Sequence, residues 1–224
     1  MTLILGIETA TKNCSVALFK DGVLIAEKQH MADGYTHAEQ LTLFIEEVVN
    51  SAAISLKDVD AVALSKGPGS YTGLRIGTST AKGLCYALEI PLLAISTLKA
   101  MAFAMTESKK SAIYCPMIDA RRMEVFSALF DKNNKEIRGV QADVVDEKTY
   151  AEFLENEVLF FGDGALKCKE IINHKNAKFI EGIFPSAKDI GILANTKFEN
   201  KEFEDVAYFE PYYLKDFVAG KKSV

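Results

Sequence analysis

The most constraining feature of this sequence is that it repeats itself half-way along. Residues 5–19 read LGIETATKNCSVALF, and residues 116–130 read PMIDARRMEVFSALF. In each copy an acidic residue, Glu8 or Asp119, ends an apolar run, and an Ala-Leu-Phe triplet begins nine positions later. The two copies are offset by 111 residues at both landmarks, and a polar turn and another apolar run follow in each. The repeat indicates that one supersecondary unit occurs twice.

The hydrophobic pattern around the first copy predicts a mixed α/β unit. Short apolar runs predict strands, and an apolar period near 3.6 residues predicts helices. The expected elements are strands at 2–8, 14–20 and 23–29, a helix near 36–52, a strand at 59–65, a helix near 72–88 and a strand at 92–95. This β-β-β-α start, occurring twice, is typical of the duplicated actin-like and ribonuclease-H-like (ASKHA) fold. We therefore expect two lobes, residues 1–106 and a degenerate copy at 107–224.

Charge and cysteine usage disfavour several functions. The formal net charge is −5, and such a chain repels a polyphosphate unless its Lys and Arg residues cluster locally. The four cysteines form no CxxC pair, which disfavours a metal or redox motif. The N-terminal segment lacks the pattern of a signal peptide, and no apolar run is long enough to span a membrane. A cytoplasmic protein without membrane contact is expected.

Several residues stand where the actin-like architecture binds a nucleotide. In that architecture, carboxylates at the ends of the first strands hold Mg²⁺ through water, and the turns that follow wrap the phosphates. Glu8 and Asp119 occupy those strand ends, Thr9 opens the first turn, and Gly162 and Gly164 frame a turn in the second half. Alternatively, these are ordinary strand-end and turn residues. The sequence is thus compatible with a vestigial nucleotide site without requiring one.

A glycine-rich loop, GPGSYTG at residues 67–73, links a predicted buried strand to a predicted helix. Backbone amides at a helix N-terminus attract anions, so the loop is a candidate anion site. It is not a Walker A loop, because the lysine is missing and the glycine spacing differs. Glycines also let a helix and a strand pack closely, and the sequence does not decide between the two interpretations.

The helix after this loop carries small residues at Gly73, Gly77 and Ala81. Glycine inside a helix costs about 1 kcal/mol relative to alanine, so these glycines need a packing reason. Either the chain's own core or a partner helix approaches this face. The helix near 36–52 has an apolar stripe that includes Leu41 and Phe44. This stripe faces either the chain's own core or a partner.

Five segments of the chain, in the right order, resemble the bacterial TsaB (YeaZ) family: ILGIETATKNCSVALFKDG, KGPGSYTGLRIGTSTAKGL, LLAISTLKAMA, MIDARRMEVFSALF and EPYYLKDFVA. Members of that family are paralogues of TsaD, the subunit that transfers a threonylcarbamoyl group to an adenosine beside the tRNA anticodon. TsaD binds its catalytic metal with a His-x-x-x-His pair, and Thr97 and Met101 stand at the matching positions here. The resemblance therefore implies an accessory subunit with no catalytic residue, no metal and no cofactor.

The resemblance also implies partners. The chain is expected to bind and support TsaD, alongside the ATPase TsaE, and to form a homodimer when alone. Contact with tRNA is expected only within the complex, if at all. The two helices of the first lobe are expected to form the surface for TsaD, with these residues: Thr36, His37, Gln40, Leu41, Phe44, Gly73, Arg75, Ile76, Gly77, Thr80 and Ala81.

Two other functions are compatible with parts of the sequence. An active ATP-dependent enzyme of the actin-like class, such as a small-molecule kinase, would need an intact nucleotide site. A protease would need a nucleophile with its base or a zinc-binding H-E-x-x-H motif, and the chain has no H-E-x-x-H and no G-x-S-x-G elbow. The missing histidine pair and the less regular second half favour the accessory subunit over both.

Overall fold

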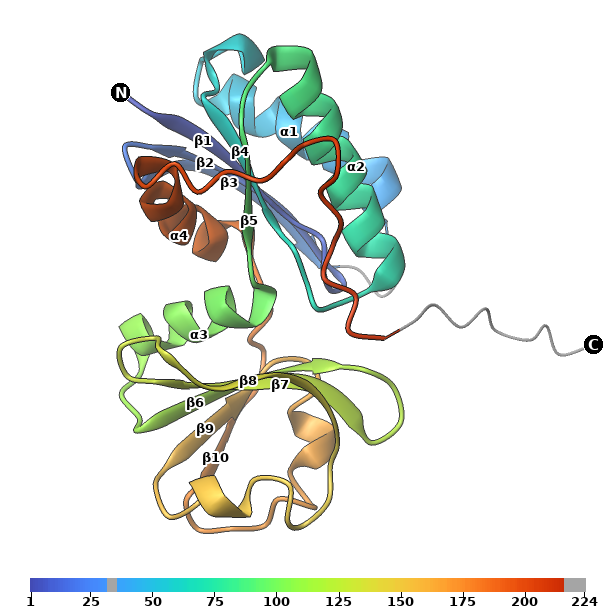
Figure 1. Cartoon of the computed structure of the whole chain (residues 1–224), viewed down its shortest axis with the longest axis vertical. Helices are drawn as coiled ribbons and strands as arrows, with labels where there is room; N and C mark the ends of the chain where they lie inside the picture. Colours follow the sequence, from blue (N-terminus) through green and yellow to red (C-terminus); the bar gives the residue numbers. More distant parts are fainter. Residues whose placement is uncertain (32–35, 216–224) are drawn as a thin grey trace, which may run out of the picture.

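The protein folds into two lobes, each built on a five-stranded mixed sheet (Figure 1). The computed structural model describes residues 1–31 and 36–215. The first sheet has the order β3-β2-β1-β4-β5 and consists of β1 (Leu3–Glu8), β2 (Asn13–Lys20), β3 (Val23–Met31), β4 (Ala61–Ser65) and β5 (Leu92–Ile95). β1 lies at its centre, antiparallel to β2 and parallel to β4. All of β1 is buried, which explains its unbroken apolar run.

The second sheet repeats the topology of the first. It has the order β10-β9-β6-β7-β8 and consists of β6 (Ile113–Asp119), β7 (Glu124–Asp131), β8 (Glu136–Val144), β9 (Val158–Phe161) and β10 (Ala177–Ile180). Its central strand β6 is antiparallel to β7 and parallel to β9, as β1 is to β2 and β4. Glu8 and Asp119 end the two central strands. The predicted duplicated fold is confirmed.

The helices between the strands are kept only in the first lobe. There α1 (His37–Ser51) and α2 (Tyr71–Leu88) lie side by side and cover one face of the sheet. At the matching points of the second lobe the chain forms only short 3₁₀ turns, Ala151–Phe153 and Leu166–Cys168. Such turns carry no 3.6-residue apolar stripe, so the sequence of the second lobe shows no helical pattern there.

The last helix of each unit packs against the sheet of the other lobe. α3 (Thr97–Ser108) follows β5 but packs against β6 and β7, whereas α4 (Ala187–Glu199) follows β10 but packs against the first sheet. Residues 204–213 then run along the first lobe, where Glu204 bridges to Leu92 and the Lys82 ammonium donates to two backbone carbonyls. α3 and α4 thus pack across the division predicted after residue 106, which stays a prediction.

The interior of both lobes is apolar, and the cysteines belong to it. Cys14, Cys85, Cys115 and Cys168 are all buried and free. Burial raises the pKa of the Cys85 thiol to about 11, and thiols held protonated in this way react slowly. In the part of the chain that the structure describes, no helix is both long and apolar enough to cross a membrane.

Candidate functional site

The carboxyl group of Glu8, at the end of β1, is completely buried. Its Oε1 accepts hydrogen bonds from the backbone N–H of Ala10 at 2.5 Å and from the Ser65 hydroxyl at 2.8 Å. Its Oε2 is buried without a hydrogen-bond partner among the described residues. Burial raises the pKa of Glu8 to about 7 from its ordinary value of 4.5, and the nearby Asp189 carboxylate adds to the rise. A carboxyl group so shielded from water is poorly placed to hold a hydrated Mg²⁺ ion.

The turn after β1 is filled by the chain's own glycine-rich loop and second helix. A Cβ atom added at Gly73 or Gly77 of α2 would overlap Thr9, and one added at Gly69 would overlap Ala10. The packing interpretation of residues 67–73 thus accounts for these glycines. The backbone that would wrap a phosphate in an actin-like site is instead covered by protein.

His37 also closes this turn from the side of α1. Its ring is buried, and its Nε2 lies 2.7 Å from the carbonyl oxygen of Thr11. Burial lowers the pKa of His37, so the ring is neutral at pH 7 and donates from Nε2 to that oxygen. This histidine ties α1 to the turn and is not on the outer surface.

The matching end of β6 is more open, but its groups are also used within the chain. The Lys167 ammonium lies 2.5 Å from Oδ1 of Asp119, which is about half exposed. Gly162 has a φ of +105°, and a Cβ there would overlap the carbonyl oxygen of Met117. A Cβ at Gly164 would press against the end of β6. The second glycine turn therefore packs on the central strand of its own sheet.

The two positions that the sequence resemblance matches to a histidine pair lie inside the molecule. Thr97 and Met101 are 0% and 1% exposed on α3. Met101 packs in an apolar cluster with Ile118 and Phe161 of the second lobe. Neither side chain offers a nitrogen ligand. Within residues 1–31 and 36–215, no group of three His, Cys, Asp or Glu side chains is placed to hold a metal ion.

The outer face of α1 and α2 differs from the predicted partner surface. Six of the predicted residues are buried within the chain: His37, Leu41, Phe44, Gly73, Gly77 and Ala81. For these six the prediction is wrong, because both stripes face the first sheet and the turn after β1. The other five are exposed or partly exposed and remain candidates: Thr36, Gln40, Arg75, Ile76 and Thr80.

Two exposed side chains that the sequence analysis missed lie on the same pair of helices. Leu43 on α1 is 54% exposed, and Tyr86 on α2 is 85% exposed. Exposed apolar side chains mark a binding surface when they form a contiguous patch, whereas single ones are common on protein surfaces. Leu43 could have been found from the sequence, because it is a leucine outside the apolar stripe of its helix. Tyr86 has no comparable signal.

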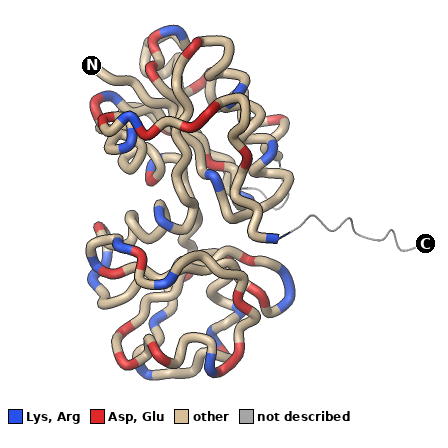
Figure 2. The backbone as a smooth tube through the Cα atoms, viewed as in Figure 1, with Lys and Arg blue, Asp and Glu red and all other residues tan. Residues whose placement is uncertain are grey.

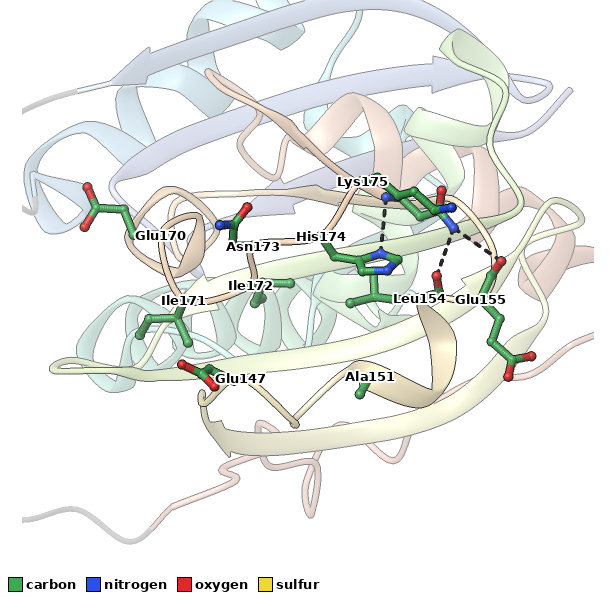
Figure 3. Close-up of a pocket in the computed structure, with 11 residues that line it drawn as sticks. Glu147, Ala151, Leu154, Glu155, Glu170, Ile171, Ile172, Asn173, His174 and Lys175 are labelled. Carbon is green, nitrogen blue, oxygen red and sulfur yellow. Dashed lines mark hydrogen bonds between the residues drawn. The ribbon is translucent and has the colours of Figure 1, made fainter.

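A separate pocket of about 830 Å³ lies in the second lobe (Figure 3). Its lining includes Glu147, Glu155, Glu170 and His174. The loop uses several of its polar groups internally: His174 Nδ1 accepts the backbone N–H of Asn176 at 3.2 Å, and the Asn176 side chain donates to two backbone carbonyls. The acidic side chains line the pocket without converging on a common point (Figure 3). The pocket therefore presents no evident binding chemistry.

Fold and site together define an actin-like, two-lobed protein whose first phosphate turn is filled by its own packing. The family model described as TsaD, tRNA N6-adenosine threonylcarbamoyltransferase, matches residues 33–223. The tRNA threonylcarbamoyladenosine biosynthesis protein TsaB of Escherichia coli K12 is 30% identical, over 98% of this chain and 97% of that protein. The chain belongs to the TsaB (YeaZ) family.

Solved structures agree with this assignment. YeaZ from Pseudomonas aeruginosa superposes with a TM-score of 0.80 at 25% identity, covering 96% of this chain and all of that one. The activator of 2-hydroxyisocaproyl-CoA dehydratase from Clostridium difficile, solved with bound ADPNP, gives a TM-score of 0.53 at 11% identity over 91% of this chain and 99% of that one. The second likeness concerns the fold alone.

Proposed function

We propose that this chain is a non-catalytic subunit for the formation of threonylcarbamoyladenosine beside the anticodon of tRNA. In this role it binds and supports a TsaD transferase, alongside the ATPase TsaE. Family membership supports the pathway. The observation that carries the non-catalytic role is the filled turn after β1, where Gly73 and Gly77 lie against Thr9. The buried Thr97 and Met101 support the same role, since neither is a nitrogen ligand.

The activity test separates this role from that of an actin-like ATPase. The purified chain is mixed with ATP and Mg²⁺ and assayed for phosphate release, and then assayed with TsaD, TsaE and unmodified tRNA for threonylcarbamoyladenosine. We expect no turnover by the chain alone and product only in the complete mixture. Multiple turnovers of ATP by the chain alone would show that it is an enzyme.

The outer face of α1 and α2 is the proposed surface for TsaD. Leu43 of α1 and Tyr86 of α2 are exposed, while the apolar stripes of both helices hold them on the sheet. Two helices lying side by side can pack against the matching pair of a paralogue. When TsaD is absent, the same face would pair two copies of this chain.

Replacing Leu43 and Tyr86 together with glutamate tests this surface. The buried charges that would result at an apolar interface should reduce co-purification with TsaD at least tenfold, since each unpaired charge costs on the order of 1–3 kcal/mol. The variant should still fold, because both side chains are exposed. A matched control is the pair Ile137→Glu and Val144→Glu, which are exposed apolar residues of β8. Equal retention of TsaD by both variants would rule out this face.

A further inference from the structure

Basic residues follow the central strands of both sheets, although the whole chain carries a net charge of −5. Lys12 lies in the turn after β1, Lys66 follows β4, and Arg75 is in the first turns of α2. Arg121 and Arg122 form the turn between β6 and β7. In the first lobe, Lys12 and Lys66 follow the carboxyl ends of the parallel strands β1 and β4, and Arg75 lies in the helix after β4. In the second lobe, the two arginines follow the carboxyl end of the central strand β6. Figure 2 shows that charges of both signs are otherwise dispersed over the lobes.

A backbone hydrogen bond and a ring contact connect the C-terminal segment to the first-lobe residues of this set. The backbone N–H of Tyr212 donates to the carbonyl oxygen of Lys66 at 2.7 Å. The ring of Tyr213 lies 4.4 Å from that of Tyr71, whose hydroxyl accepts a hydrogen bond from Arg75. Figure 1 shows this segment running from α2 toward the second lobe.

The same segment reaches the β6–β7 turn. The Lys215 ammonium pairs with the carboxylate of Glu124, whose backbone N–H donates to the carbonyl oxygen of Arg121 at 3.1 Å. The C-terminal segment therefore connects Lys66 and Arg75 of the first lobe to the turn that carries Arg121 and Arg122. We name as the basic rim these four residues and Lys12 of the turn after β1, with Tyr71, Tyr212 and Tyr213.

None of the five cations of the basic rim forms an ion pair with a residue in the described ranges. Of the acids at the end of β6 and the start of β7, Asp119 pairs with Lys167 and Glu124 pairs with Lys215. The Asp163 carboxylate accepts the backbone N–H of Asp119 at 3.0 Å.

The turn that carries Arg121 and Arg122 is held in a defined shape. Both residues have positive φ values, +72° and +48°, a conformation that non-glycine residues adopt at a cost. The backbone N–H of Arg121 donates to Asp119 Oδ1 at 2.7 Å. Both arginines are exposed, so the turn presents two neighbouring guanidinium groups to solvent.

We propose that the basic rim binds the phosphate backbone of the tRNA substrate, with its tyrosines contacting unpaired bases. This inference rests on the proposed function, which supplies the tRNA. The five cations are spread over both lobes and do not converge on one point, as suits a phosphate chain better than a single nucleotide. The nucleotide alternative is further disfavoured because the turn after β1 is filled. The arginines and Tyr212 are exposed and Tyr71 and Tyr213 are partly exposed, and such side chains can stack on unpaired bases.

The test replaces Arg121 and Arg122 with glutamate and leaves Arg75 intact, because the Arg75 guanidinium also bonds the Tyr71 hydroxyl within the first lobe. The control, Lys132→Glu with Lys135→Glu, makes the same charge change in the turn at the other end of β7, where both lysines are exposed. Each variant is purified in complex with TsaD and titrated against fluorescently labelled unmodified tRNA, at several salt concentrations. The Arg variant should bind tRNA at least tenfold more weakly. The slope of log K against log salt concentration should become shallower by the amount that about two phosphate contacts contribute. The control should change affinity less than twofold.

The outcomes separate this inference from the proposed function. Co-purification of the Arg variant with TsaD tests the proposed function first, and we expect it to be unchanged. The inference is overturned if the wild-type complex binds no tRNA, if the Arg variant binds tRNA normally, or if both variants weaken binding equally. A second variant, Arg121→Gln with Arg122→Gln, should give an intermediate loss. Full loss with glutamine would indicate damaged folding of the turn and would overturn the charge argument.

Discussion

A single residue, Glu8, illustrates how far a residue type at a given position predicts chemistry. Its place at the end of β1 was correctly predicted, and that place is where actin-like enzymes bind metal. Whether it can do so depends on its surroundings, which come from residues far away in sequence. Ser65 bonds one of its oxygens, and the other oxygen is buried without a partner among the described residues.

Replacing Glu8 with glutamine should therefore remove a pH dependence of stability. Below pH 4.5 the Glu8 carboxyl is protonated in both the folded and the unfolded chain, so its burial causes no pH-dependent loss of stability. Between pH 4.5 and about 7 the unfolded chain releases the proton while the folded chain keeps it, so the stability of the wild type falls as pH rises. Above pH 7 the free energy of unfolding has fallen by its full amount, roughly 3 kcal/mol. Urea unfolding at pH 5 and pH 8 measures most of this fall. The glutamine variant should lose this fall and keep the smaller pH dependence of the other shifted groups, among them Asp189, whose pKa burial raises to about 6, and His37, whose pKa burial lowers. An unchanged slope would contradict the assignment.

At the scale of one element, α2 contains two glycines in opposite environments. A Cβ at Gly77 would overlap the Thr9 side chain, whereas a Cβ at Gly83 would meet nothing within 4 Å. Gly77→Ala should therefore destabilise the fold by about 1–3 kcal/mol, and Gly83→Ala should stabilise it by up to about 1 kcal/mol. Chemical unfolding of both variants checks this. The reverse order would mean that the small-residue face of α2 points outward. Loss of TsaD binding by a Gly77 variant would thus report a damaged fold and not a lost contact.

The elements also show why the sequence predicted some features and not others. β1 and the stripe of α1 were predictable because local burial leaves a local period in the sequence. The small residues of α2 correctly indicated a close neighbour, but the neighbour is a turn some 60 residues earlier, which no local pattern identifies. α4 was missed because it mixes small, polar and apolar residues and buries only a few of them. The basic rim could not be predicted for a related reason, since its cations are dispersed along the sequence and are connected only in the folded chain.

At the scale of the whole molecule, the lobes are connected by more than the chain between them. α3 and α4 each cover the sheet of the other unit. Residues 204–215, which we name the C-terminal strap, add a third connection. Its first part is anchored to the first lobe through Lys82 and β5, and its last part contacts the second lobe, where Leu214 packs against the apolar cluster that contains Met101. Such a strap should restrict movement of one lobe against the other.

Truncation of the strap tests this restriction. Removing residues 210–224 deletes the Tyr212 bond to Lys66, the Tyr213 ring contact, the Leu214 packing and the Lys215–Glu124 pair. Removing only 216–224 deletes none of these contacts and serves as the control. Because each deleted contact contributes on the order of 1 kcal/mol, the longer truncation should lower the melting temperature by several degrees. It should also speed hydrogen exchange in residues 66–73 and 119–124, which the strap touches directly or through Glu124. If the two truncations exchange and melt alike, the strap does not hold the lobes together, and α3 and α4 alone fix their arrangement.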